Sequence, residues 1–111
     1  MLKEELKELL EKGEKVRIID VREADEYKAS GDRFVFEQKD EQGNVTGTIT
    51  AENIPMGKVY TDANKGKISK SERIIAVCKA GERCRDVAKS MKDNKGYWFD
   101  YLEGGLDDWN A

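Results

Sequence analysis

Histidine is absent from this 111-residue sequence, which has a single proline and only two cysteines. Without histidine the chain has no imidazole ligands for a metal and no Cys-His or Ser-His catalytic pair. Two cysteines cannot form a disulfide framework, and a free thiol in a reducing compartment needs a reason in packing or in chemistry. Cys78 and Cys84 are therefore the residues that most need an explanation.

Long apolar runs are also missing. No stretch approaches the ~20 apolar residues of a membrane span, and the chain starts with a charged helical segment rather than a signal peptide. The formal net charge of −3 gives no electrostatic support to nucleic-acid binding. We expect a cytoplasmic protein without membrane or nucleic-acid partners. The length suits one compact domain over residues 1–111.

The first half of the chain predicts two helices, one buried strand and a hairpin. Leucines at positions 2, 6, 9 and 10 have the spacing of an amphipathic helix, which Gly13 should end. The β-branched run Val16–Val21 is typical of a buried strand, and Glu23–Ala29 of a short helix. The surface hairpin that follows should comprise strands at Arg33–Glu37 and Val45–Thr50, with the polar turn 40–44 between them.

The second half alternates strands with helices. Asn53-Ile54-Pro55 is expected to be extended, and the segment from there to Gly66 is ambiguous, with one or two helical turns. The later elements are strands at Arg73–Val77 and Tyr97–Leu102, a helix at Cys84–Lys92, and a short final helix with Leu106 and Trp109 on one face. This alternation predicts an α/β domain with a mainly parallel sheet.

Three segments with charged, thiol or glycine residues lie at the ends of predicted strands. They are Asp20-Val21-Arg22, the loop from Cys78 to Arg83, and Glu103-Gly104-Gly105. In open parallel sheets, ligands bind beyond the carboxyl ends of the strands. If the sheet is parallel, all three segments lie on one edge, and together they indicate a binding site there.

Cys78 has the surroundings of a reactive thiolate. It ends a strand and precedes a tight turn into a helix, so its sulfur should face loop N–H groups and a helix N-terminus, which favour an anion. Lys79 and Arg83 add positive charge, and Gly81 permits the backbone geometry of a six-residue cradle. The ordinary cysteine pKa of about 8.5 commonly falls into or below the neutral range in such surroundings. We predict this shift for Cys78.

Four pieces of the sequence stand in order at sensible spacing. They are Ile18-Ile19-Asp20-Val21-Arg22-Glu23 with Glu26-Tyr27, Asn53-Ile54-Pro55, the loop Cys78-Lys79-Ala80-Gly81-Glu82-Arg83, and Glu103-Gly104-Gly105-Leu106 with Trp109. Together they resemble the rhodanese-like sulfurtransferases over nearly the whole chain. The resemblance implies a five-stranded parallel sheet with helices on both faces, and a catalytic Cys78 that accepts sulfane sulfur. It also implies that the amides and side chains of Lys79, Ala80, Gly81, Glu82 and Arg83 bind an anionic donor.

The chain departs from the family pattern in two places. Residues 32–49 form an insertion that family members usually lack, in a region that often contains histidine. Because loops tolerate added length at small thermodynamic cost, we expect the insertion to lie outside the core and to leave Phe34, Val35 and Phe36 out of it. Cys84 stands where the family more often has Ser or Thr. Its register with Val87 and Met91 favours a packed thiol over a resolving cysteine.

The remaining candidates divide into binding and bracing residues. Arg83 opposes the dipole of the helix it begins, which is explained if an anion binds there. For Lys79 and Glu82, a role as solvated surface charge and a role in tuning the bound substrate are about equally favoured. Asp20 and Arg22 should brace the edge of the loop through charge-assisted hydrogen bonds. Near the C-terminus we expect three residues to pack in the core, namely Trp98, Leu106 and Trp109.

The sequence predicts a sulfurtransferase that needs no cofactor and no metal. The Cys78 thiolate would take the outer sulfur of thiosulfate or a similar small anionic donor, release sulfite, and pass the sulfur to a thiophilic acceptor such as a thiol or a protein. Such two-step covalent catalysis gives ping-pong kinetics.

Three alternatives stay open at the level of sequence. The first is a sulfur-relay or protein-interaction module of the same fold, with the hairpin as its recognition surface. The second is a cysteine phosphatase or arsenate reductase, although those enzymes have five residues between Cys and Arg where this chain has four. The third is a dithiol redox protein that uses Cys78 and Cys84.

Overall fold

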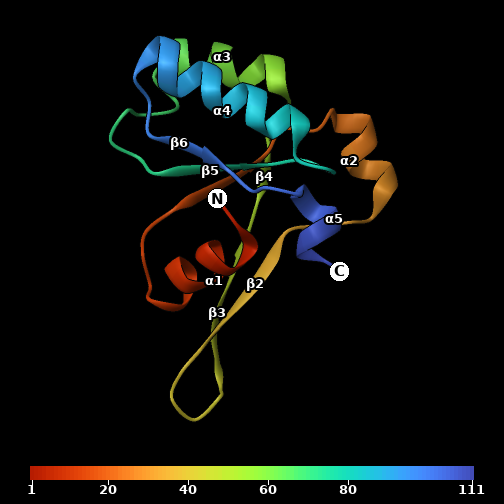
Figure 1. The fold of residues 1–111 in the computed structure, drawn as a ribbon, viewed down its shortest axis with the longest axis vertical. Helices are drawn as coiled ribbons and strands as arrows, with labels where there is room; N and C mark the ends of the chain where they lie inside the picture. Colours follow the sequence, from red (N-terminus) through yellow and green to blue (C-terminus); the bar gives the residue numbers. More distant parts are fainter.

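Four parallel strands form the central sheet in the computed structural model, which describes residues 1–111 (Figure 1). In spatial order they are β4 (Glu52–Asn53), β1 (Arg17–Asp20), β5 (Ile74–Val77) and β6 (Phe99–Tyr101). Neighbouring strands are all parallel, so their carboxyl ends meet at one edge. The rhodanese-like α/β fold is confirmed, with four strands in this sheet rather than five, because the two remaining strands pair only with each other.

Helices cover both faces of this sheet (Figure 1). On one side lie α3 (Met56–Asn64) and α4 (Glu82–Lys95), and on the other α1 (Lys3–Glu11) and α5 (Gly105–Trp109). The short α2 (Ala24–Ser30) lies beyond the carboxyl edge. Successive strand residues point to opposite faces, so Ile18 packs in the core with α1 while its neighbour Ile19 packs in the core with α3 and α4.

The helix boundaries follow the apolar spacing closely in the first helix and less closely elsewhere. The ambiguous segment before Gly66 is one nine-residue helix, α3. Helix α4 has 14 residues and extends beyond the predicted Cys84–Lys92 at both ends. Its added first turn contains Glu82 and Arg83, so the loop between β5 and α4 is shorter than the six-residue motif suggested.

The insertion is a β-hairpin, as predicted. Strands β2 (Val35–Lys39) and β3 (Val45–Thr50) are antiparallel, and the Asp40 carboxylate accepts the N–H groups of Gln42 and Asn44 to close the turn. The tip projects away from the sheet (Figure 1).

The base of the hairpin contradicts the expectation that the insertion lies outside the core. Phe34, just before β2, is buried and stacks on Trp109 of α5 with 4.5 Å between ring centroids. Phe36 and Ile49 are half-buried against the same cluster, whereas Val35 is 46% exposed. The alternation of a strand explains the difference, since every second side chain turns toward α1 and α5.

The two tryptophans have opposite surroundings. Trp109 is buried, as predicted, but the prediction that Trp98 belongs to the core is wrong, because Trp98 is 51% exposed. It precedes β6, whose Phe99 takes the core position, and the Arg73 guanidinium lies over the Trp98 ring at 5.2 Å. None of the helices is both long and apolar enough to span a bilayer.

Candidate active site

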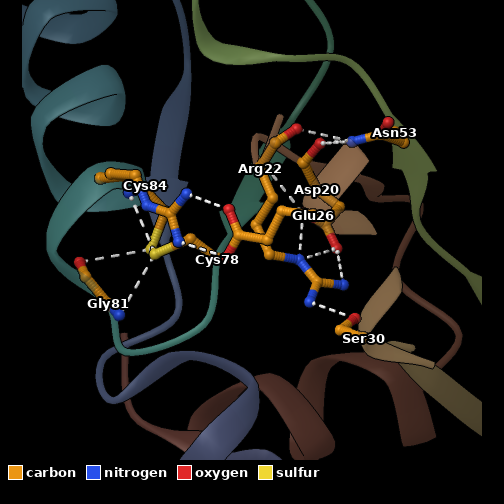
Figure 2. A network of polar contacts seen from close by, with 9 residues as sticks. Asp20, Arg22, Glu26, Ser30, Asn53, Cys78, Gly81 and Cys84 are labelled. Atoms are coloured by element: carbon orange, nitrogen blue, oxygen red, sulfur yellow. Dashed lines mark hydrogen bonds and ion pairs between the residues drawn. The ribbon is translucent and has the colours of Figure 1, made fainter. Parts of the chain in front are cut away.

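The cysteine loop lies at the carboxyl edge of the sheet, where β5 ends at Val77 and α4 begins at Glu82 (Figure 2). The three segments that the sequence assigned to one edge do meet there. The Val21 N–H donates to the Val77 carbonyl at 2.9 Å, and the Leu106 N–H donates to the Cys78 carbonyl at 2.8 Å. The loop is therefore held between the end of β1 and the first turn of α5.

Two glycines let the backbones approach this closely. A Cβ on Gly105 would lie 2.5 Å from the Cys78 carbonyl oxygen, and the backbone φ at Gly105 is +59°. At Gly81, where φ is +103°, a Cβ would lie 2.9 Å from the Gly104 nitrogen. Any other residue at either position would force backbone apart from backbone and carry a conformational penalty as well.

The Cys78 sulfur is buried and surrounded by donors. Its Sγ accepts the N–H of Gly81 at 3.2 Å, the N–H of Cys84 at 3.3 Å and the thiol S–H of Cys84 at 3.2 Å (Figure 2). The Cys84 thiol is the largest cause that lowers the pKa of Cys78, to about 6, against the opposing effect of burial. The two amides help, and the Arg83 charge is the smallest contribution. Cys78 is therefore a thiolate at neutral pH.

Cys84 is fully buried, in the register with Val87 and Met91 that the sequence indicated. Its packed position is confirmed, but packing is not its only contact. The sulfur lies within reach of three acceptors, namely the Cys78 sulfur, the Gly81 carbonyl at 3.3 Å and the Leu102 carbonyl at 3.7 Å. The neighbouring Cys78 thiolate and burial both raise the pKa of Cys84 well above the ordinary range, so Cys84 stays protonated.

Four main-chain amides of the loop donate to no acceptor within the protein. They belong to Lys79, Ala80, Glu82 and Arg83. Together with the amides of Gly81 and Cys84 that already hold the sulfur, they place six N–H groups along the loop and the first turn of α4. N–H groups at the start of a helix stabilise negative charge on the cysteine or on an atom attached to it.

Arg83, which the sequence assigned to anion binding, is paired with a carboxylate of the protein at the outer opening, or mouth, of the loop. Its guanidinium forms two bonds to the Glu26 carboxylate of α2, from Nη1 to Oε1 at 2.5 Å and from Nη2 to Oε2 at 2.9 Å. Arg83 lowers the pKa of Glu26, so the carboxylate is charged and neutralises the arginine. Glu26 lies in the first of the four segments that carry the family resemblance. Its ion pair with Arg83 was not predicted, because that pairing depends on the tertiary structure.

The other charged residues of the loop are at the surface. The ammonium of Lys79 pairs with Asp107 of α5 at 2.9 Å, and both side chains are more than half exposed. Glu82 is exposed and forms no ion pair. Lys79 is therefore already paired and Glu82 is acidic, so neither side chain offers a free positive charge to an anionic donor.

Asp20 and Arg22, the predicted bracing residues, form a buried ion pair beside the loop. Both side chains are buried, and the Arg22 guanidinium donates to the Asp20 carboxylate at 2.8 to 3.0 Å. Arg22 also donates to the hydroxyl of Ser30, the last residue of α2 (Figure 2). A further bond to the Asp32 carbonyl fixes the segment that follows α2. The Asn53 amide donates to the carbonyls of Asp20 and Arg22. A buried ion pair with all these partners sets geometry more than it adds stability.

A large hollow of the molecule lies away from this site. It has a volume of about 660 Å³ and lies around Arg17, Arg73 and Trp98, at the amino ends of β1 and β5. The opposite end of the sheet contains the cysteines, so the hollow takes no part in their chemistry.

A family model for the rhodanese-like domain matches residues 2–111. The chain belongs to the rhodanese-like domain family. Two crystal structures agree with this assignment. SSP1007 of Staphylococcus saprophyticus superposes with a TM-score of 0.68 and 28% identity, over 98% of this chain and 90% of the other. A rhodanese-like domain protein of Staphylococcus aureus superposes with a TM-score of 0.67 and 26% identity, over 98% and 88%.

A curated relative points to sulfur chemistry at the level of the rhodanese-like family. The chain is 26% identical over 108 residues to the "Putative sulfur carrier protein YrkF" of Bacillus subtilis, which covers 97% of this chain. This chain spans only about half of that relative, 49% of its length. Family membership and this similarity support a role in sulfur transfer, while donor and acceptor have to be argued from the site itself.

Proposed function

We propose that this chain is a sulfurtransferase that carries sulfane sulfur as a persulfide on Cys78. One observation supports the assignment above the others, namely that the Cys78 sulfur is buried among two amides and a thiol that hold it as a thiolate. A thiolate is the form that attacks sulfur. The four amides without a protein acceptor supply donors for the negative charge of an outer sulfur bound to Cys78.

The reaction has two balanced halves. In the first, the Cys78 thiolate attacks the outer sulfur of the donor, the S–S bond of the donor breaks, and its electron pair leaves with the departing group, which is sulfite when thiosulfate is the donor. In the second, a thiolate or cyanide acceptor attacks that outer sulfur, and Cys78 leaves as a thiolate again. No oxidant or cofactor is consumed, and the kinetics should be ping-pong.

The positively charged side chains around the mouth of the cysteine loop are already paired, and this favours a donor that carries little charge. Arg83 is paired with Glu26 and Lys79 with Asp107, so each loop cation faces a carboxylate. A dianion such as thiosulfate must compete with those carboxylates, whereas a thiol persulfide brings only one charge, which the loop amides can accept. We therefore propose a persulfide on a thiol or protein as the preferred donor and thiosulfate as a weaker one.

The similarity to a sulfur carrier favours a second candidate, a relay module that passes sulfur between proteins and has little activity on small molecules. A phosphatase or arsenate reductase has no such support. The loop has four residues between Cys78 and Arg83, and the arginine that would hold the tetrahedral anion is engaged by Glu26.

Mass spectrometry combined with Cys78→Ser tests the proposal. The wild type, incubated with thiosulfate or with glutathione persulfide, should gain one sulfur atom at the cysteine loop and then form thiocyanate when cyanide is added. Cys78→Ser should do neither while melting at a similar temperature. Persulfide without thiocyanate supports the relay module, and thiocyanate from Cys78→Ser rules out the assigned nucleophile.

A further inference from the structure

The site contains a second sulfur that the proposed transfer does not use. Cys84 is fully buried, and its Sγ lies 3.2 Å from the Cys78 Sγ. A serine hydroxyl at this position could donate the same hydrogen bond, and an alanine or valine could fill an apolar position. What sulfur alone adds is the ability to form a covalent bond to the neighbouring sulfur.

We propose that Cys84 is a resolving cysteine that attacks the inner sulfur of the Cys78 persulfide, releases hydrogen sulfide and closes a Cys78–Cys84 disulfide. This inference rests on the proposed function, because it needs the persulfide. The bond between the Cys78 Sγ and the outer sulfur breaks, and its electron pair leaves with the outer sulfur, which is thereby reduced to sulfide. The new bond joins the two cysteine sulfurs, and the proton of the Cys84 thiol goes to the departing sulfide.

The geometry suits displacement at the Cys78 sulfur. A disulfide bond is about 2.05 Å long, so the two sulfurs must move together by only about 1 Å from their present separation. Cys84 lies in the first turn of α4, and its fully buried side chain contacts the Cys78 sulfur. Displacement at the Cys78 sulfur requires the outer sulfur to lie on the side opposite Cys84.

Loading the site with sulfur also changes the charge that Cys84 faces. In the resting state the Cys78 thiolate keeps Cys84 protonated and raises its pKa, so Cys84 serves as a hydrogen-bond donor. In the persulfide the negative charge is on the outer sulfur, and the inner sulfur is an electrophile. The contact that stabilises the thiolate at rest becomes the approach of a nucleophile once sulfur is bound.

This reaction gives the domain two outcomes for each bound sulfur. An acceptor that arrives first takes the sulfur and regenerates the thiolate. Without an acceptor, Cys84 converts the sulfur to sulfide and leaves the loop as a disulfide, which a dithiol reductant must open before the next cycle. The second outcome is a sulfide-releasing activity that a single-cysteine loop cannot perform.

The experiment loads the full chain with thiosulfate under anaerobic conditions, without acceptor or reductant. Sulfide is measured, and intact mass is determined after acid quenching and thiol alkylation. We expect the wild type to release one sulfide per chain, to lose two hydrogen atoms, and to leave neither cysteine open to alkylation. Cys84→Ser should keep the added sulfur and release none above background. Wild type without thiosulfate should remain fully reduced, which controls for oxidation by residual air.

The outcomes separate the inference from the function on which it rests. A stable persulfide on the wild type, with Cys84 alkylated and no sulfide, overturns the inference and leaves the sulfurtransferase in place. No added sulfur on Cys84→Ser from either thiosulfate or glutathione persulfide, with Cys84→Ala tested alongside to allow for a fold defect in one variant, overturns both. Sulfide from the wild type together with persistent sulfur on either variant supports both.

Discussion

The cysteine loop, which connects β5 to α4, and the hairpin of β2 and β3 are fixed in opposite ways. The loop is short, its sulfur is buried, and backbone from β1 and α5 lies against it within hydrogen-bonding distance. The hairpin is long, and only its base is packed, while Val45 near the tip is 53% exposed. The backbone of the loop is held by close contacts that leave no space for a Cβ atom at its neighbouring glycines. The tip of the hairpin is held instead by the hydrogen bonds of its own turn.

Glycine substitutions should give the largest contrast between these regions. In Gly105→Ala the new methyl meets the carbonyl oxygens of Cys78 and Lys79 at 2.5 and 2.6 Å, and both are backbone atoms. We expect a loss of about 3 to 5 kcal/mol of stability and of most sulfur transfer, because the loop must move. Gly43→Ala, also at positive φ but in open space, should cost only about 1 to 2 kcal/mol and leave activity unchanged. Thermal melts and thiocyanate assays measure both, and full activity in Gly105→Ala would contradict the tight-contact account.

The next largest effect is expected at the base of the hairpin. Phe34→Ala removes a buried ring that stacks on Trp109, and we expect a loss of about 3 to 5 kcal/mol in the free energy of unfolding. Val45→Ala, in the same hairpin but exposed, should change stability by no more than about 0.5 kcal/mol. Denaturant unfolding measures the pair. Equal effects would mean that the hairpin behaves as one unit rather than as an anchored base and a free tip.

The same contrast explains which features could be predicted from sequence. The place of the loop between a strand and a helix was predictable because it is local. The loop combines a cysteine at the end of a strand, a glycine three residues later and the start of a helix. These features are adjacent in the chain, and together they predict a tight turn with N–H groups near the sulfur. The pairing of Arg83 with Glu26 and the burial of Phe34 were not predicted, because each depends on a partner more than 50 residues away. Trp98 was misplaced because it lies just before the start of β6, and an alternating pattern does not show how far the cover of each face extends along the chain.

A smaller effect should appear in the charge of Cys78. The wild-type pKa is about 6, so the thiolate is present above that pH and is lost as the pH falls through it. Cys84→Ala removes the S–H donor, which is the largest cause of the lowered pKa, and should move the midpoint upward. Cys84→Ser keeps a donor and should stay near the wild-type midpoint, although it cannot resolve a persulfide. The ultraviolet absorbance of the thiolate, measured against pH, gives these midpoints. An unchanged midpoint in Cys84→Ala would show that the Cys84 S–H does not lower the pKa of Cys78.

The smallest expected effect concerns the mouth of the loop. Glu26→Gln keeps the shape of the side chain but removes the charge that neutralises Arg83, whose side chain is 37% exposed. The freed guanidinium should attract thiosulfate, and a gain of about 1 kcal/mol for a partly exposed charge corresponds to a fall of about five-fold in KM.

This effect should shrink as salt is added, because solvent ions screen exposed charges. Turnover at saturating thiosulfate should change little, since a charge at the mouth acts on binding in the ground and transition states alike. Glu41→Gln makes the same change of charge at the exposed hairpin turn, far from the loop in Figure 1, and should leave KM as it is. A rise in KM for Glu26→Gln would mean that the ion pair is needed to hold the loop in shape. No change would mean that Arg83 does not reach the donor even when it is free. Either result would contradict the view that paired charges at the mouth discriminate against a dianionic donor.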